Sequence, residues 1–180
     1  MGDILPVRPA LRLIAITAGD EAAIEWTCHR AVQSWGEVAF RSPLFDFNQT
    51  NFYEAEMGPS LKKQLVAFAQ LMDADALPDA KLLANEWERE YASIAPSSFV
   101  RPINVDPGYL TEAKLVLAST KDRDHRIYLR DGIYAEITLY FNQRQWRVSR
   151  WTYPDYQQPA YFDFFNQARE FLRRRLGEFH

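Results

Sequence analysis

Short apolar runs alternate with longer stretches of helical spacing through the N-terminal part of the chain, and this order most constrains the fold. Four runs with the length of strands cover residues 11–18, 37–46, 64–72 and 99–105. Two longer stretches, residues 20–35 and a segment that begins at Pro78, repeat apolar side chains with the helical period. The order β-α-β-β-α-β is typical of the ferredoxin-like pattern, in which two helices cover one face of an antiparallel sheet. The sequence therefore predicts an α+β fold with a ferredoxin-like sheet.

The rest of the chain adds elements to this sheet. Residues 109–118 have the pattern of a helix or a strand, residues 125–141 that of a hairpin, residues 146–151 that of a strand and residues 159–176 that of a helix. No linker rich in Pro, Gly or Ser, no block of like charges and no repeat marks a boundary. We therefore expect residues 1–180 to form a single domain, in which a C-terminal hairpin and a terminal helix extend the ferredoxin-like sheet.

Composition excludes several classes of protein. The 180 residues are 47% hydrophobic and 14% aromatic, which is enough for a packed core. The net charge is -3 and both signs are mixed along the chain, so no overall field attracts nucleic acid or anionic lipid. The lone cysteine, Cys28, rules out an internal disulfide and a cysteine-rich zinc site, and it suits a reducing compartment.

The N-terminal segment has neither the basic region nor the cleavage site of a signal peptide. No apolar run approaches the roughly 20 residues that span a bilayer. We expect a cytoplasmic protein of bacterial type that has neither a membrane nor a nucleic acid as its partner and that can form a homo-oligomer.

The turn at Arg130-Asp131-Gly132 decides which residues of the predicted hairpin face each other. A two-residue turn pairs Arg130 with Ile133 and puts charged side chains on the apolar face. A three-residue loop with Gly132 in the left-handed region avoids this conflict. It pairs Leu129 with Ile133, Ile127 with Ala135, His125 with Ile137, Tyr128 with Tyr134, and Arg126 with Glu136. We predict the three-residue loop, with a positive φ at Gly132.

Asp106-Pro107-Gly108 follows the fourth predicted strand. Aspartate before proline is typical of a helix start, where the aspartate caps and the proline takes the first position. The alternative is a base or a ligand-holding carboxylate at a strand end, with His125 as its partner. A helix over residues 109–118 would separate Asp106 from His125 by roughly 15 Å, at opposite ends of the sheet. We therefore expect Asp106 to cap a helix and to stand apart from His125.

The polar loop before His125 is the candidate site, because this is the only histidine flanked by other ionisable groups. In the predicted fold the loop shares one end of the sheet with residues 17–20 and 72–75, and so with the N-termini of both helices. Helix N-termini and basic side chains favour an anion such as phosphate. We expect His125 and Asp122 to be catalytic, because both can exchange a proton with a ligand. The residues expected to hold the ligand are Lys121, Arg123, Ser119, Thr120 and Gly19.

Acidic residues at the same end leave an alternative open. A divalent cation could be held through oxygen ligands by Asp20, Asp73, Asp75, Asp122 and Asp124. Three scattered histidines and one cysteine do not favour a transition metal. We assign no metal ligand and leave the cofactor open.

The aromatic run WTYPDY, residues 151–156, is expected at the opposite end of the sheet, near Asp106. The apolar helix over residues 159–176 is expected to cover that face. The alternative is an aromatic platform that stacks nucleobases. We therefore expect a ligand beside His125 rather than beside Trp151.

Several long runs of the chain resemble one family. They are VDPGYLTEAKLVLASTKDRDHRIYLRDGIYAEITL, WTYPDY, FYEAEMGPSLKK and KLLANEWE. On these runs the chain resembles the bacterial domain-of-unknown-function family 4416 over nearly its whole length. The resemblance implies no activity, substrate or catalytic residue. Some members carry a label as GTP-binding, but MGPSLKK lacks the first glycine of a G-x-x-x-x-G-K-[ST] motif and the Ser or Thr after its lysine.

Two functions fit this pattern. The first is the binding, with or without turnover, of a small anionic, phosphorylated or nucleotide-like ligand at residues 121–125. The second is a non-catalytic interaction or self-association module that uses a sheet edge or an aromatic face. The first needs a concave site that joins residues 17–20 to residues 121–125, and the second needs a flat apolar patch or a symmetric interface.

Overall fold

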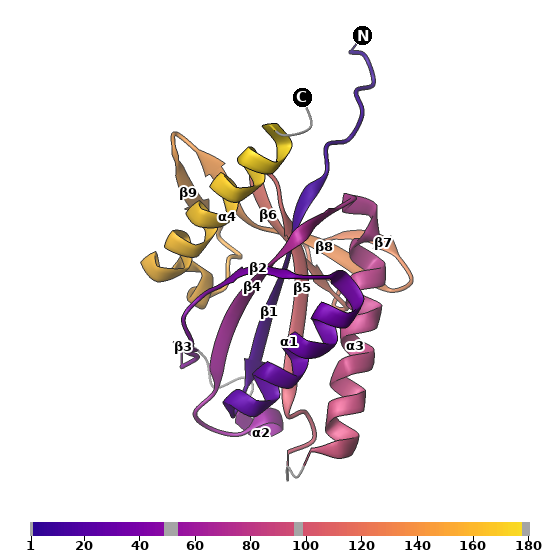
Figure 1. Cartoon of the computed structure of the whole chain (residues 1–180), viewed down its shortest axis with the longest axis vertical. Coiled ribbons are helices and arrows are strands. Elements are labelled where there is room, and N and C mark those ends of the chain that lie inside the picture. The colour runs from indigo at the N-terminus through magenta and orange to yellow at the C-terminus, as the bar shows by residue number, and fades with distance from the viewer. Residues whose placement is uncertain (1, 49–53, 96–98, 178–180) are drawn as a thin grey trace.

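The computed structural model describes residues 2–48, 54–95 and 99–177, which form one antiparallel sheet with helices on both faces (Figure 1). The strands are β1 (Ala10–Ala18), β2 (Val38–Arg41), β3 (Phe45–Asp46), β4 (Lys62–Met72), β5 (Ile103–Leu110), β6 (Lys114–Ser119), β7 (Ile127–Arg130), β8 (Ile133–Asn142) and β9 (Gln145–Val148). The helices are α1 (Glu21–Trp35), α2 (Glu54–Met57), α3 (Leu77–Ile94) and α4 (Pro159–Gly177), with short 3-10 helices η1 (Ala74–Ala76) and η2 (Pro154–Gln157). The predicted α+β class is confirmed.

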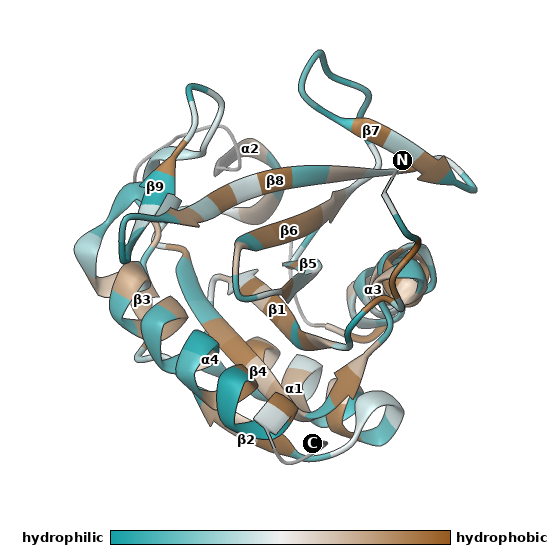
Figure 2. Ribbon diagram, turned by 90° about the horizontal axis from the view of Figure 1, so that it is seen from above, coloured by the Kyte–Doolittle hydropathy of each residue, from teal (hydrophilic) through white to brown (hydrophobic). Residues whose placement is uncertain are grey.

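The strand order is β2-β4-β1-β5-β6-β8-β7, with β3 paired to β4 and β9 paired to β8. Figure 2, which looks along the strands, shows α4 on one side of the sheet and α3 on the other. We call the face packed by α1 and α3 the first face, and its core includes Ile14, Ile16 and Trp87. The face packed by α4 is the second face, and its core includes Leu13 and Phe165. Alternating residues of β1 therefore supply two separate cores.

Helix α1 forms where the sequence predicted it. The Asp20 side chain accepts a hydrogen bond from the backbone N–H of Ala23 at 2.8 Å, and Gly36 ends the helix with a φ of 84°. The predicted apolar stripe included both Cys28 and Val32, and Cys28 is buried, whereas Val32 is 38% exposed.

Asp106-Pro107-Gly108 does not start a helix, and this prediction was wrong. The three residues lie within β5, where Pro107 pairs with Ile14 of β1. Pairing of β5 with β6 begins only at Gly108. On the β6 side, Pro107 therefore has no paired residue in the described strands, and its lack of an N–H costs no hydrogen bond there. A Cβ on Gly108 would overlap the carbonyl oxygen of Val116 in β6. Glycine is needed here for the close approach of two strands, and residues 109–118 form the end of β5 and most of β6.

The two long first-face helices start at opposite ends of the sheet, which corrects the expectation that both N-termini meet beside His125. Strands β1 and β4 are antiparallel neighbours, with Ala18 opposite Lys62 and Ala10 opposite Met72. Helix α1 follows the Ala18 end and α3 follows the Met72 end. Strand β6 runs parallel to β1, because both are antiparallel to β5, so the loop after Ser119 leaves at the Ala18 end.

The β7–β8 hairpin combines features of both predicted registers. Ile127 pairs with Ala135 and Tyr128 with Tyr134, as expected, and Gly132 has a φ of 77°. However, Arg130 and not Leu129 pairs with Ile133, so the predicted three-residue loop was wrong. A bulge at Leu129 adds one residue to β7, so the rest of the strand keeps the predicted facing. Arg130 stays opposite Ile133, and its guanidinium donates to the exposed carboxylate of Asp79 in α3.

None of the helices in the described part of the chain is long and apolar enough to cross a membrane.

Candidate functional site

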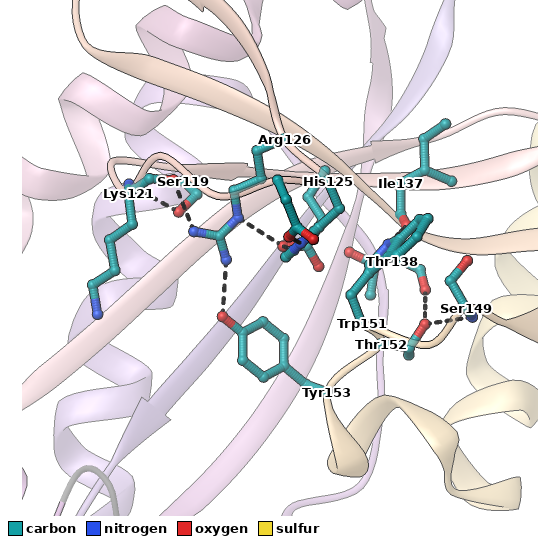
Figure 3. A network of polar contacts seen from close by, with 12 residues as sticks. Ser119, Lys121, His125, Arg126, Ile137, Thr138, Ser149, Trp151, Thr152 and Tyr153 are labelled. Carbon is teal, nitrogen blue, oxygen red and sulfur yellow. Dashed lines mark hydrogen bonds and ion pairs between the residues drawn. The ribbon is translucent and has the colours of Figure 1, made fainter.

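Three segments far apart in the sequence meet above the second face of the sheet (Figure 3). They are the loop from Ser119 to Arg126, strand β8, and the connection from β9 to α4. Figure 3 shows His125 and Trp151 side by side and Arg126 directed toward Tyr153. We call this group, with Glu136 of β8, the His125 cluster.

His125 is held on three sides. Its Nδ1 lies 2.9 Å from Oδ1 of Asp124, and its Nε2 lies 3.2 Å from Oε2 of Glu136. The imidazole stacks on the indole of Trp151, with ring centroids 5.3 Å apart and planes 13° apart. The expectation that His125 and Trp151 occupy opposite ends of the sheet was therefore wrong.

Arg126 is the hub that joins the three segments. Its Nε donates to Oε2 of Glu136, its Nη1 to the carbonyl of Lys121 and its Nη2 to the hydroxyl of Tyr153, each at 2.9 Å. Burial is the largest single effect and lowers the pKa of the Arg126 guanidinium, but the hydrogen bonds and charges of Glu136 and Tyr153 together outweigh it, so the net pKa is raised. Each guanidinium nitrogen already has a partner, so Arg126 positions the cluster. The predicted contact between Arg126 and Glu136 is confirmed.

Glu136 is the buried anion of the cluster. Its side chain is 3% exposed, because alternation along β8 turns it toward the second face, beneath the β9–α4 connection. Oε2 accepts from both His125 and Arg126. Oε1 accepts no hydrogen bond from any residue that the structure describes. This oxygen is itself buried, so it is an acceptor inside the fold and not one that faces a ligand at the surface.

The β9–α4 connection is anchored to β8 by backbone contacts. The indole Nε1 of Trp151 donates to the carbonyl of Ile137 at 3.1 Å, and the hydroxyl of Thr152 donates to the carbonyl of Thr138 at 2.7 Å. The backbone N–H of Ser149 in turn donates to the Thr152 hydroxyl at 2.8 Å. These bonds fix the plane of the Trp151 ring against which His125 stacks.

A second polar group lies deeper on the same face. Nζ of Lys63 and Oδ2 of Asp155 are 2.6 Å apart, with side chains 6% and 4% exposed. Asp106 contacts Nζ of Lys81 at 3.1 Å and accepts from Nδ2 of Asn104 at 2.7 Å. Burial raises the pKa of Asp106, but the charges of Lys81 and Lys63 and the hydrogen bonds from Asn104 and Lys81 together outweigh it, so the net pKa is lowered.

A small cavity opens between these deeper residues. It has about 10 Å³ of space for the centre of a water molecule, which is close to the room that one water needs. Its walls include Thr17, Lys63, Asn104 and Asp106. The hydroxyl of Thr17 is buried and has no hydrogen-bond partner within the described ranges. A space of this size admits no metabolite, so the His125 cluster, which borders the exposed loop before β7, is the better candidate for a ligand site.

The other predicted ligand residues are placed as follows. Thr120, Lys121, Asp122 and Arg123 lie exposed in the loop before His125. The hydroxyl of Ser119 accepts a hydrogen bond from the backbone N–H of Lys121 at 3.2 Å, and so shapes the loop.

Gly19 lies exposed at the end of β1, near the carbonyl of Met57, and no contact places it in the described cluster. The His125 cluster therefore does not join residues 17–20 to residues 121–125 in the single concave site that the sequence predicted.

Sequence reasoning missed four members of the site. Glu136 was expected only as a partner of Arg126. Trp151 and Tyr153 were expected at the other end of the sheet, and no role was predicted for Arg150. Arg150 is 81% exposed, with Nη2 3.5 Å from Oδ2 of Asp124. A signal for Glu136 was present, because an acidic residue in an otherwise apolar strand needs a cationic partner when it is buried.

No group of three or more His, Cys, Asp or Glu side chains in the described ranges is placed to hold a metal ion. The five aspartates that the sequence offered as oxygen ligands are spread over both ends of the sheet.

Comparison with known proteins gives a family and no activity. No curated protein and no solved structure matches the chain significantly. The family described as a domain of unknown function (DUF4416) matches residues 8–171, which is most of the chain. The chain therefore belongs to this family of unknown function, as the sequence runs quoted above had indicated.

Proposed function

We propose that the protein binds a small anionic, phosphorylated or nucleotide-like ligand at the His125 cluster. The observation that carries this proposal is the His125–Trp151 stack, an imidazole held between two carboxylates and an aromatic ring beside exposed cations. An aromatic wall, a titratable imidazole and nearby positive charge together suit a planar or phosphorylated ligand.

Exposed basic side chains around the His125 cluster, which we call its rim, supply the positive charge that would hold an anion. Arg123 and Arg150 are exposed, and Lys121 lies exposed in the same loop. The pair between Arg150 and Asp124 has side chains 81% and 76% exposed, so it is weak in water and a ligand anion can replace the carboxylate. Asp122 remains beside these cations as a second group for proton exchange.

His125 is the group proposed to move a proton. Glu136 is fixed by Arg126 and therefore orients Nε2, whereas Asp124, the partner of Nδ1, is exposed and can swing away. Displacement of Asp124 would present Nδ1 to the ligand at the rim. This arrangement allows turnover, although binding alone needs only the stack and the cations.

A thermal-shift and calorimetry screen tests the proposal with inorganic phosphate, pyrophosphate, sugar phosphates and nucleotides, each with and without Mg²⁺. We expect at least one compound to raise the melting temperature, and Arg150→Ala and Lys121→Ala to remove that rise. Arg174→Ala is the matched control, because it removes an exposed arginine from α4. The proposal fails if no compound binds, or if Arg174→Ala weakens binding as much as Arg150→Ala does.

We further infer that β1, α1, β2, β4, α3 and β5 form the ferredoxin-like unit expected from the sequence. The antiparallel order β2-β4-β1-β5 and the placing of α1 and α3 on one face support this. Cys28 is a free and buried thiol, which supports a reducing cytoplasm, and the family resemblance supports a bacterial origin.

A second candidate function is self-association through the edge of the sheet. β7 is the last strand in the order, and all four of its residues are exposed. Ile127 is 68% exposed and Ile137, on the neighbouring strand, is 40% exposed. An exposed apolar edge strand is a template for pairing with another chain.

A further inference from the structure

The segment before β1 is an arm whose large apolar side chains lie exposed. Residues 2–9 are all exposed and have no secondary structure, and Figure 1 shows them extending away from the body. Ile4 is fully exposed, Leu5 is 77% exposed and Val7 is 79% exposed. Arg8 forms an ion pair with Glu112 at 3.8 Å, and both side chains are well exposed. Three large apolar side chains in water favour a bound state of the arm.

We infer that the arm, residues 3–8, adds as a strand to the outer edge of β7 in a second copy of this chain. The inference rests on the self-association proposed above and names the segment that pairs with the edge. The outer edge of β7 pairs with none of the strands that the structure describes. Exchange of arms by two copies gives a closed dimer with two identical contacts.

Pro6 fixes which side of the arm can pair. Successive N–H groups of a strand point to opposite sides, and proline has none, so Pro6 must face away from β7. The N–H groups of Leu5 and Val7 then face the edge. The side chains of these two residues lie on one face of the extended sheet, because side-chain direction alternates with a period of two.

The exposed residues of the hairpin complement that arrangement. Ile127 pairs with Ala135, so its side chain lies on the first face, the same face as Ile137 two positions along β8. Leu5 and Val7 would continue this row beyond the edge and cover Ile127. The contact therefore joins apolar surfaces that the isolated chain leaves in water.

The arm cannot reach the edge of its own chain in this way. It leaves the sheet at Ala10 of β1, and β5, β6 and β8 separate β1 from β7. Four strand spacings amount to about 19 Å. Pairing through Leu5 and Val7 leaves the three Cα–Cα steps from Val7 to Ala10 to bridge that gap, and these span at most about 11 Å. The partner is therefore a second copy.

Light scattering after size-exclusion chromatography tests the inference on the full chain. We expect the full chain to be a dimer. Deletion of residues 2–9 should raise the dissociation constant of this dimer at least tenfold, and Val7→Lys and Ile127→Lys should each raise it by a similar factor. Val100→Lys is the matched control, because Val100 is 86% exposed and lies outside the arm and the hairpin. The control should stay dimeric.

Disulfide trapping decides whether the contact runs between chains. The native Cys28 is buried, so cysteines introduced at the surface react selectively. Mixed Val7→Cys and Ile127→Cys proteins should oxidise to a linked pair, whereas each protein alone should not.

The possible failures are distinguishable. A dimer that is lost in Ile127→Lys but retained without residues 2–9 supports edge association and overturns the arm. A full chain that stays monomeric at all concentrations overturns both the arm and the self-association function.

Discussion

The imidazole of His125 stacks on the indole of Trp151 with nearly parallel planes, 26 positions apart in the sequence. This contact joins the loop before β7 to the connection before α4. It brings a titratable ring and an aromatic wall to the same place on the second face.

The stack should couple the two side chains energetically. In a double-mutant cycle of His125→Ala and Trp151→Ala, we expect the effects on the free energy of unfolding to be non-additive by about 0.5–1.5 kcal/mol, as for aromatic pairs. Urea denaturation measures each variant. His29 is exposed on α1, so the cycle of His29→Ala with Trp151→Ala should be additive. Additivity in both cycles would show that the stack contributes nothing.

Removal of Arg126 should be severely destabilising. Arg126→Ala leaves Glu136, which is 3% exposed, without its cation, and we expect a loss of about 3–5 kcal/mol in the free energy of unfolding. The double change Arg126→Met with Glu136→Leu should cost less than the single one, because it removes both charges.

The pair of Arg30 with Glu90 is the surface control, with side chains 36% and 43% exposed. Arg30→Ala should cost less than about 1 kcal/mol in the same denaturation experiment. Equal losses for Arg126→Ala and Arg30→Ala would contradict the burial argument.

Asp106 should contribute stability that is lost in acid. Its pKa is lowered in the folded state, because Lys81, Lys63 and the hydrogen bond from Asn104 together outweigh the effect of burial. A lowered folded pKa gives stability that is present above the unfolded value of about 3.9 and is lost as the pH falls through the folded pKa. Asp106→Asn should therefore be less stable than the natural chain at neutral pH, and the difference should shrink below about pH 4.

Denaturation as a function of pH measures this difference. Asp163→Asn, an exposed change on α4, serves as its control and should keep the natural slope in acid. A constant gap between the natural chain and Asp106→Asn across the acid range would refute the linkage.

Two glycines should respond differently to alanine. At Gly108 the added Cβ overlaps the carbonyl of Val116, and the backbone of β6 must move, so we expect a loss of at least about 2 kcal/mol. At Gly132 there is open space but a φ of 77°, so we expect only the left-handed penalty of about 1–2 kcal/mol. Gly177→Ala meets nothing nearby and should be neutral. Thermal unfolding measures the stability of the three variants. A larger loss of stability for Gly132→Ala than for Gly108→Ala would contradict this prediction.

Local pattern was sufficient for much of the fold. The stripe of α1, its Asp20 cap and the apolar runs of β1 and β4 follow from periods of 3.6 and 2, which each segment carries in its own residues. The facing of Arg126 and Glu136 could also be predicted, because a hairpin pairs residues that are close in the sequence. These features depend on residues within about ten positions of one another, so they can be predicted from the local sequence pattern.

Tertiary structure alone decided the site. Asp106-Pro107-Gly108 has the local signal of a helix start, but β1 pairs with all three residues and β6 with Gly108, and this pairing overrides the signal. The meeting of His125 with Trp151 and of Lys63 with Asp155 depends on where α4 packs and on how the sheet orders its strands. Each of these contacts joins segments whose local patterns are independent of one another, so only the packing of the whole chain brings them together.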